Sequence, residues 1–411
     1  MSRNLLVLIH DYPYNIGEPF FETEIDYLSK SFDNVYVFST MGKRKEIPTR
    51  KYPSNVKCFP LECNHNWVKN SIMGLFSTDN YFNLKNKHWK RKIMAAYLLG
   101  RNASIYKKVV KLINLNNIEI TNIAVYCYWL TLGVAGAKLS NWVLKQKGYK
   151  PRYISRCHGY DVYSEIMPCN YQPFQYEVIK ELDNVCPCSN YGTKYLKNKY
   201  SLFDGKIITA RLGTRDFGTN MNQNDSNKYV FVTCSGLRGV KRLDLFAKAF
   251  SIIAKNNKKI EWLCIGDGED KEKIVDILNK NDVYNQCNFV GNIPITKVYE
   301  LYSGGQLYCF VNVSSSEGIP VSIMEAISFG LPVIATNVGG NNEIVDSKNG
   351  FLLESNPTEN DIVCAMKKII MLNREDYNSL KSESRKKWLE LYSANNNYSK
   401  WCSFLRGDKN A

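Results

Sequence analysis

Two glutamates, Glu317 and Glu325, mark the stretch of this sequence that is best suited to bind a ligand. Glu317 follows an apolar strand predicted at 307–313, and Glu325 lies about one turn inside a helix predicted at 321–329. The free N–H groups of a helix start favour a phosphate, whereas carboxylates favour hydroxyl groups. The pattern therefore suits a nucleotide-sugar, with its phosphates and its ribose or hexose hydroxyls. The alternative is a helix start stabilised by two acidic side chains.

The same stretch predicts a strand–loop–helix–strand unit of a parallel sheet. Pro320 suits the first helical position, where its missing N–H costs nothing. Gly330 and Pro332 end the helix, and a second apolar strand is predicted at 333–336. Similar alternation from residue 4 onward predicts an open doubly wound sheet, whose ligand crevice lies at the carboxyl ends of its strands.

Residues 316–336 contain Glu317 in Ser-Glu-Gly-Ile-Pro-Val-Ser, then Glu325 in Glu-Ala, then Gly-Leu-Pro-Val-Ile-Ala-Thr. This stretch closely resembles the signature of the retaining glycosyltransferases of family 4. The resemblance continues through 337–340, 343–345 and 349–352. It implies an α/β protein with the GT-B fold, in which two Rossmann-like doubly wound domains face a central cleft. It also implies transfer of a sugar from a nucleotide-diphosphate sugar with retention of configuration. First-domain motifs look most like the members that assemble bacterial surface polysaccharides, such as capsule or lipopolysaccharide.

The length of 411 residues is enough for two domains, each with its own core. We expect an acceptor-binding domain at 1–215, joined by a C-terminal helix at about 392–411, and a nucleotide-sugar-binding domain at 216–391. The polar run 219–228 is the expected linker. The aromatic tail has helical spacing, and GT-B chains usually end in a helix that returns to the first domain.

The net charge of +15 favours anionic partners, namely nucleotide phosphates, nucleic acid or an acidic membrane surface, or it simply keeps the protein in solution. No recognised nucleic-acid module is present, so we expect no nucleic-acid partner. Thirteen scattered cysteines and the lack of a signal segment predict reduced thiols in the cytoplasm. The longest uncharged apolar stretch, 123–137, is shorter than the roughly twenty residues of a membrane helix.

In the first domain, the candidate residues follow predicted strands at 4–9 and 153–157. Gly17 lies in a loop that resembles the family's first loop, which faces the donor phosphates and the acceptor; otherwise it is a turn residue. His158 begins His-Gly-Tyr-Asp, similar to the family motif whose histidine contacts the transferred sugar, with Asp161 orienting the loop. Without the resemblance, a structural histidine is the commoner outcome.

In the second domain, Lys241 matches the family's lysine for the donor diphosphate, but the position of the family's arginine holds Gly236. Arg238 is the expected replacement, and Arg242 or backbone amides are the alternatives. Gly266 and Asp267 resemble the second nucleotide-side loop, and Gly291 is expected near the base. The predicted catalytic residues are Glu317 and His158, and the predicted nucleotide-sugar residues are Gly17, Arg238, Lys241, Gly266, Asp267, Gly291, Gly318, Ile319, Pro320, Val321 and Glu325.

The chain contains no Asp-x-Asp, which the metal-dependent GT-A glycosyltransferases use to hold Mg²⁺ or Mn²⁺. Phosphate charge must then be met by Lys241, a nearby arginine and the helix start. We therefore predict no essential metal ion and no cofactor, the nucleotide-sugar being a substrate.

Residues 67–99 mix cations with bulky apolar side chains, including the cluster Lys85, Lys87, Lys90, Arg91 and Lys92. Such a segment can lie on anionic lipid headgroups at the inner face of the plasma membrane, or it is a helix with one buried and one solvated face. Docking on lipid headgroups is the alternative that agrees with a lipid-linked glycan as the acceptor. The other functions that remain open are a GT-B sugar synthase with a soluble acceptor and a non-catalytic polyanion-binding protein.

Overall fold

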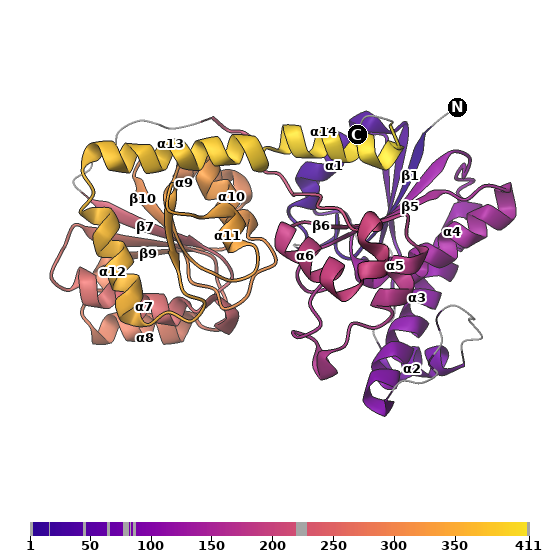
Figure 1. Ribbon diagram of the computed structural model, residues 1–411, viewed down its shortest axis with the longest axis horizontal. Coiled ribbons are helices and arrows are strands. Elements are labelled where there is room, and N and C mark those ends of the chain that lie inside the picture. The colour runs from indigo at the N-terminus through magenta and orange to yellow at the C-terminus, as the bar shows by residue number, and fades with distance from the viewer. Residues whose placement is uncertain are drawn as a thin grey trace. The chain divides into compact units, whose positions relative to one another are not determined.

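The computed structural model describes residues 3–15, 17–43, 47–63, 66–76, 82, 84, 88–218 and 228–408. It divides the chain into two compact units (Figure 1). Unit 1 consists of Met1–Leu212 with Ala394–Ala411, and unit 2 consists of Gly213–Ser393. These limits lie within three residues of the domain limits expected from the sequence, 215/216 and 391/392.

Unit 1 is built on a parallel six-stranded sheet with the order β3-β2-β1-β4-β5-β6. Its strands are β1 (Asn4–Ile9), β2 (Asn34–Ser39), β3 (Val56–Pro60), β4 (Ile123–Cys127), β5 (Arg152–Cys157) and β6 (Asn184–Pro187). The chain moves outward from β1 to β3 and then returns to the other side of β1 with β4. The carboxyl ends of β1 and β4 therefore flank a topological switch point, where open α/β sheets bind ligands.

Alternating apolar residues give this sheet a core on each face. In β1, Leu6 and Leu8 belong to one cluster, whereas Leu5 and Val7 belong to the other. Successive strand side chains point to opposite faces, so a continuous apolar run of this kind requires helices on both sides. One face is covered by α1 (Phe21–Ser31) and α14 (Ala394–Arg406), and the other by α3 (Trp89–Leu115), α4 (Gly133–Lys147), α5 (Gln175–Glu181) and α6 (Asn190–Lys199). The short helix α2 (Trp67–Leu75) packs on α3.

Unit 2 repeats this architecture with the strand order β12-β11-β10-β7-β8-β9. Its strands are β7 (Tyr229–Cys234), β8 (Ile260–Ile265), β9 (Cys287–Gly291), β10 (Leu307–Asn312), β11 (Val333–Thr336) and β12 (Gly350–Leu353). Its helices are α7 (Leu243–Ala254), α8 (Lys271–Lys280), α9 (Ile295–Ser303), α10 (Val321–Ser328), α11 (Asn341–Ile344), α12 (Glu359–Ile370) and α13 (Arg374–Leu391). The helices α7, α8 and α12 share one core on one side of the sheet (Figure 1). The switch point here lies between β7 and β10.

Several elements differ from the sequence prediction. The segment 206–210 has the composition of a short strand and lies beside β6, where Ile208 N–H donates to Val185 O (3.1 Å) and Ala210 N–H donates to Pro187 O (2.9 Å). It forms an isolated bridge between Val185 and Ile207 and no regular strand. The strands β3 and β12 were not predicted, and α2 lies in the segment 67–99, for which a helix was one of two alternatives. Residues 219–227 of the expected linker lie outside the described residues. All thirteen cysteines, each of which is described, are free thiols. In the described part of the chain, no helix has both the length and the apolar character needed to cross a membrane.

A buried ion pair joins the first and last helices of unit 1 to its sheet. Glu24 of α1 lies 3.6 Å from Arg156 of β5, and both side chains are fully buried. Glu24 also accepts hydrogen bonds from the Tyr126 hydroxyl (2.9 Å) and from Trp401 Nε1 of α14 (2.7 Å). The Arg156 guanidinium in turn stacks on the Trp401 ring at 4.3 Å and donates to the carbonyl of Ala210. This network holds α14 beside α1 (Figure 1).

Replacing Glu24 by glutamine is expected to destabilise unit 1 by about 3–5 kcal/mol, because the buried guanidinium of Arg156 loses its counter-charge. Glutamine keeps an acceptor for Tyr126 and Trp401, so packing is preserved. Denaturant unfolding measures the change, and Glu22→Gln on the same helix, at a partly exposed position, is the matched control. Equal unfolding midpoints for the two variants would show that the pair contributes nothing.

Candidate functional site

The predicted donor residues of unit 2 lie in loops that follow the carboxyl ends of its strands. Hydrogen bonds between backbones tie these loops together: Ser315 N–H donates to Val240 O (2.8 Å), and Leu237 N–H donates to Asp267 O (3.0 Å). Gly266 N–H donates to Gly291 O at 2.9 Å, which joins the loop after β8 to the end of β9. The loops after β7, β8, β9 and β10 thus form one edge, and the switch point lies within it.

An ion pair spans this switch point. Lys241 Nζ, after β7, lies 2.7 Å from Glu317 Oε1, after β10. Asn312 Nδ2 donates to the same oxygen at 3.2 Å. The Glu317 side chain is only 10% exposed and that of Lys241 25%, so the pair is well shielded from water. The structure therefore brings together the residue predicted to hold the diphosphate and the one predicted to hold the sugar.

Arg242 fixes the loop that carries Glu317. Its guanidinium and Nε donate to the carbonyls of Val313 (2.7 Å), Ser314 (2.8 Å) and Ser355 (2.9 Å). These hydrogen bonds engage the N–H donors of Arg242 with backbone carbonyls of the protein itself. The alternative in which Arg242 binds the donor diphosphate is therefore disfavoured, and its role here is to position the 313–317 loop.

Arg238 is exposed, and its side chain folds back over Gly236. Its Nε lies 3.4 Å from the point where a Cβ on Gly236 would stand. The chain bends sharply here, because Arg238 N–H donates to Gly236 O at 3.0 Å. The guanidinium thus lies beside Gly236, the position that holds an arginine in the family that the sequence resembles.

Close backbone approach explains two glycines of the site. Gly339 has φ +51°, and a Cβ there would lie 1.8 Å from the Glu317 carbonyl oxygen. Gly266 has φ +126°, and a Cβ there would lie 1.9 Å from the Ser235 carbonyl oxygen. A side chain at Gly339 would displace the loop that carries Glu317, and a side chain at Gly266 would displace the backbone just before the 236–242 loop.

The start of α10 is open to an anion. Gly318 and Ile319 lead into Pro320, which is the residue before the helix rather than its first residue, and no side chain caps the helix. The N–H groups at Val321 and Ser322 are the first of the helix and carry its positive dipole end. This geometry suits the phosphate predicted for the loop 318–321.

Glu325 lies on α10 and is partly exposed. Tyr299 of α9 donates a hydrogen bond from its hydroxyl to Glu325 Oε1 at 3.0 Å. Burial raises the pKa of Glu325 to about 7, although the Tyr299 hydrogen bond acts in the opposite direction. A carboxyl of this kind changes between donor and acceptor near neutral pH.

In unit 1, His158 follows β5 and is packed against the rings of Trp129 (4.5 Å), Tyr128 (4.8 Å) and Phe20 (5.5 Å). Burial, with a further contribution from the nearby Arg156, lowers the pKa of His158 to about 3, so the ring is neutral. Its Nε2 is buried and has no hydrogen-bond partner among the described residues. A neutral ring with one nitrogen unpartnered is suited to a sugar hydroxyl.

Asp161 orients this histidine loop, as the sequence predicted. Its two carboxylate oxygens accept the N–H groups of His158 and Leu130, each at 2.7 Å. Burial raises the pKa of Asp161 to about 6. Asp161 therefore joins the ends of β4 and β5.

Gly17 lies where the loop after β1 turns back toward α1. A Cβ there would lie 2.3 Å from Asp11 Oδ2, so a larger residue would require the Asp11 side chain to move. The next residue, Glu18, is buried and accepts the N–H groups of His10 (3.0 Å), Asp11 (2.7 Å) and Tyr12 (2.8 Å). Trp129 Nε1 also donates to Glu18, so Glu18, which follows Gly17, and His158 both contact Trp129.

Several residues of the site were not found by sequence reasoning. Tyr299 and Asn312 contact the two glutamates from other elements, and neither stands in a recognisable motif. Glu18 has no sequence signal beyond its place in the first loop. Among the described residues, no three His, Cys, Asp or Glu side chains are grouped so that they could hold a metal ion.

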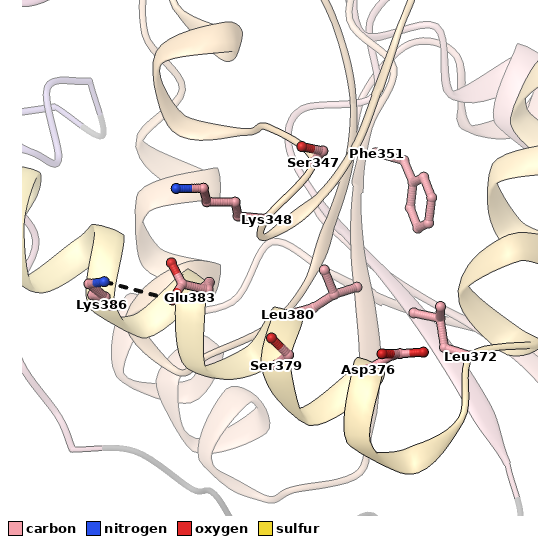
Figure 2. Close-up of a pocket in the computed structure, with 9 residues that line it drawn as sticks. All are labelled: Ser347, Lys348, Phe351, Leu372, Asp376, Ser379, Leu380, Glu383 and Lys386. Atoms are coloured by element: carbon pink, nitrogen blue, oxygen red, sulfur yellow. Dashed lines mark ion pairs between the residues drawn. The ribbon is translucent and has the colours of Figure 1, made fainter.

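Unit 2 also contains a cavity of about 450 Å³ (Figure 2). It is lined by the α13 residues Asp376, Ser379, Leu380, Glu383 and Lys386, together with Ser347, Lys348, Phe351 and Leu372. None of these residues is among the predicted site residues. The cavity therefore adds nothing to the candidate site.

Comparison with known proteins identifies the domain that carries this edge. Residues 216–387 match the family described as glycosyl transferases group 1. We call this matched segment the group 1 domain. All of the predicted donor residues except Gly17 lie within the group 1 domain.

Two relatives show how far the similarity extends. The GtfA subunit of a UDP-N-acetylglucosamine–peptide N-acetylglucosaminyltransferase from Streptococcus agalactiae is 25% identical over 279 residues, which is 64% of this chain and 53% of that protein. An uncharacterized glycosyltransferase of Haemophilus influenzae is 31% identical over 205 residues, 49% of this chain and 50% of that protein. The chain thus spans about half the length of these relatives.

The fold has matches over nearly the whole chain. Sucrose-phosphate synthase from Thermosynechococcus elongatus superimposes with a TM-score of 0.71 at 14% identity, covering 98% of this chain and 99% of that one. Together with the two parallel six-stranded sheets, this shows the GT-B fold with its two Rossmann-like domains.

The Glu325 carboxyl is expected to titrate near pH 7, which ¹³C NMR of labelled glutamate measures, with Glu325→Gln giving the assignment. Tyr299→Phe removes the hydrogen bond that favours the carboxylate, so the pKa of Glu325 should rise further. Because the native carboxyl holds a proton that the unfolded one releases from about pH 4.5, its contribution to stability decreases as pH rises to about 7.

The matched control for this titration is Tyr284→Phe, which removes a partly exposed hydroxyl elsewhere in the group 1 domain. An unchanged titration in Tyr299→Phe, or a Glu325 midpoint close to 4.5, would contradict the assignment of a desolvated carboxyl.

Proposed function

We propose that the chain is a retaining glycosyltransferase that moves a sugar from a nucleotide-diphosphate sugar to a growing, lipid-linked glycan of a bacterial surface polysaccharide. The observation that carries the proposal is the Lys241–Glu317 pair at the switch point of a group 1 domain. It places a phosphate-binding cation and a hydroxyl-binding carboxylate in contact. The GtfA relatives are named for UDP-N-acetylglucosamine, so UDP-sugars are the first donors to test.

In this proposal the donor is held by three kinds of group. Lys241, Arg238 and the N–H groups at the start of α10 bind the diphosphate, and Glu325 accepts the ribose hydroxyls. Glu317 accepts hydroxyls of the transferred sugar, and Gly266, Asp267 and Gly291 lie on the nucleotide side. In unit 1, the neutral His158 supplies Nε2 as an acceptor for the same sugar, and Gly17 lies close to the phosphates.

The proposed chemistry needs no protein nucleophile. The leaving phosphate helps to deprotonate the acceptor hydroxyl on the face that it leaves, and Lys241 with the α10 dipole stabilises the charge that develops on it. Binding of the donor must loosen the contact between Lys241 and Glu317, since the lysine then faces phosphate. The proposal includes no essential metal ion, no cofactor and no nucleic acid, and it places the enzyme in the cytoplasm.

Two substitutions are expected to separate donor binding from catalysis. Glu325→Ala should weaken binding of the free nucleoside diphosphate by about 1.5–3 kcal/mol, because charge-assisted hydrogen bonds to the ribose are lost. Glu317→Gln should leave this affinity unchanged or raise it, since Lys241 loses its competing counter-charge, while turnover falls strongly. Calorimetry measures the affinity, after a thermal-shift screen has chosen the nucleotide.

Turnover is followed as release of the nucleotide in the presence of a bacterial lipid extract, and His158→Ala should reduce it with little change in nucleotide affinity. Asp361→Asn is the control, because Asp361 is an exposed acidic residue of α12 that is not among the predicted site residues. Unchanged nucleotide affinity in folded Glu325→Ala, or near-normal turnover in Glu317→Gln, would contradict the assigned roles. Failure of every nucleotide to bind would favour the non-catalytic polyanion-binding alternative.

The lipid-linked part of the proposal is supported by the outer face of α2. Val68, Ile72, Leu75 and, just after the helix, Phe76 follow helical spacing and are at least half exposed. The opposite side of α2 is locked onto α3, because a Cβ on Gly74 would lie 1.9 Å from the Ala96 carbonyl oxygen. The apolar face therefore points away from the unit's core.

Exposed cations accompany this face. Lys69 on α2 and Lys90 and Lys92 at the start of α3 are exposed, and Trp89 beside them is 60% exposed. Arg91 is already engaged, since it donates to the Cys169 carbonyl and stacks on Tyr171, and Lys85 and Lys87 lie outside the described residues. Polybasic attraction to an anionic surface contributes about 1 kcal/mol per side chain, which suits reversible docking.

The protein is expected to sediment with vesicles of phosphatidylglycerol at low salt, to be released by high salt through screening, and to ignore phosphatidylcholine. Reversing Lys69, Lys90 and Lys92 to glutamate should abolish sedimentation, and so should Ile72→Glu with Leu75→Glu. Met371→Glu, at an 81% exposed apolar position of the group 1 domain, is the control.

Nucleotide affinity should be the same in all of these variants. If wild-type protein stays in the supernatant with anionic vesicles at low salt, the acceptor is soluble, as in a sugar synthase.

A further inference from the structure

The switch point of unit 1 carries a group of polar side chains that the proposed donor site does not use. His10 follows β1, Thr40 follows β2, and Thr131 follows β4. His10 Nδ1 lies 2.8 Å from Thr40 Oγ1, and its Nε2 lies 3.4 Å from Thr131 Oγ1. These three side chains thus line the carboxyl edge of the sheet at the point where strand order reverses.

Arg101 of α3 reaches this edge. Its Nη2 lies 3.4 Å from His10 Nδ1 and 3.5 Å from Thr40 Oγ1, which are long contacts for a guanidinium. Its Nε is buried and has no hydrogen-bond partner, and no described carboxylate forms an ion pair with the side chain. A partly buried cation of this kind is costly unless an anion compensates it.

The position of Arg101 is fixed by its neighbour. Asn102 is fully buried, and its Nδ2 donates to the Thr131 carbonyl at 3.1 Å while its Oδ1 accepts Ala135 N–H at 3.0 Å. These bonds join α3 to the start of α4. The backbone of α3 is therefore fixed at the position from which the partly buried Arg101 side chain reaches the edge.

The Glu18 carboxylate also belongs to this region, but it does not pair with Arg101. Its oxygens accept three backbone N–H groups, at His10, Asp11 and Tyr12, and the indole N–H of Trp129. Its charge is therefore met by the loop after β1. The cation of Arg101 remains without an anionic partner among the described residues.

We propose that Arg101, with the hydroxyls of Thr40 and Thr131, binds an anionic group of the acceptor, a phosphate or a carboxylate. A guanidinium binds both groups through a planar pair of N–H donors, and the two hydroxyls add donors from neighbouring strands. The assignment to the acceptor rests on the proposed function, in which unit 1 receives the acceptor. The presence of an anion site at Arg101 does not depend on it.

The test uses the full chain and three soluble probes, inorganic phosphate, glycerol phosphate and glucuronate, titrated at constant ionic strength and followed by NMR and calorimetry. Wild-type protein should bind at least one of them saturably. Arg101→Gln should weaken that binding by at least about tenfold, the loss expected for a charge-assisted hydrogen-bond pair. Arg101→Lys should recover it only in part, because a lysine lacks the planar fork.

Lys107→Gln is the matched control, since Lys107 is an exposed cation on the same helix. Phosphate against glucuronate tells which anion the site prefers. Vesicles of phosphatidylglycerol tell whether a lipid headgroup is the source, because only then does Arg101→Gln reduce sedimentation while Lys107→Gln does not.

Nucleoside diphosphate affinity is measured on the same samples. If no probe binds wild-type protein, or if Arg101→Gln binds as tightly as Lys107→Gln, the anion site is refuted. If Arg101→Gln weakens nucleotide binding as well, the site serves the donor and the acceptor assignment is overturned. If the probes bind at Arg101 but no nucleotide binds the protein, the proposed function fails and the anion site stands.

Discussion

The contact between Lys241 and Glu317 is the interaction on which the candidate site of unit 2 depends. It joins the loop after β7 to the loop after β10, the two strands at which the sheet order reverses. Parallel strands force both loops to the same edge, so a cation from one and a carboxylate from the other meet without any special local sequence. In the shielded environment of the edge the attraction between them is stronger than on an open surface. A ligand that carries both phosphate and hydroxyl groups can replace this ion pair, because its phosphate can contact Lys241 and its hydroxyls can contact Glu317.

The pair can hold this geometry because the surrounding backbone is fixed by contacts that make no use of a ligand. Arg242 donates hydrogen bonds to the backbone carbonyls of Val313, Ser314 and Ser355. Gly339 has no side chain, which allows its backbone to lie close to the carbonyl of Glu317. Both residues stand close to predicted site residues in sequence, yet their work is structural. A site that must exchange an internal ion pair for a ligand needs such a frame, since otherwise the loops would move with the exchange.

Prediction from the sequence was most successful where a single segment contains both the secondary-structure pattern and the candidate residues. The strand–loop–helix unit at 307–336 and the place of Glu317 and Glu325 follow from local patterns, and the structure has β10, α10 and β11 there. Partners that come from distant segments could not be found in this way: Tyr299 reaches Glu325 from α9, and Trp401 reaches Glu24 from the C-terminal helix. The segment 206–210 has strand composition and donates two backbone hydrogen bonds to the edge strand β6, but the pairing is too short to make a regular strand, and composition does not reveal its length. From the sequence, Arg238 could be identified only as an arginine two residues after the position expected for it. Its side chain lies near Gly236 because the backbone bends there, and the sequence does not reveal this bend.

The two units treat charge differently at equivalent edges of their sheets. In unit 2 the lysine is already neutralised by Glu317, so an incoming phosphate competes with an internal carboxylate and gains only the difference between two ion pairs. In unit 1 the histidine at the end of β5 is neutral, the Glu18 carboxylate is met by backbone N–H groups, and Arg101 has no carboxylate partner in the described part of the chain. An anion at that edge would not have to displace a described carboxylate from Arg101. If the unit 2 edge binds the donor as proposed, this exchange favours a ligand that satisfies several groups at once, whereas the proposed anion site of unit 1 requires no such exchange. This difference follows from the contacts within each unit alone, and it gives the two edges different selectivity although their strand order is the same.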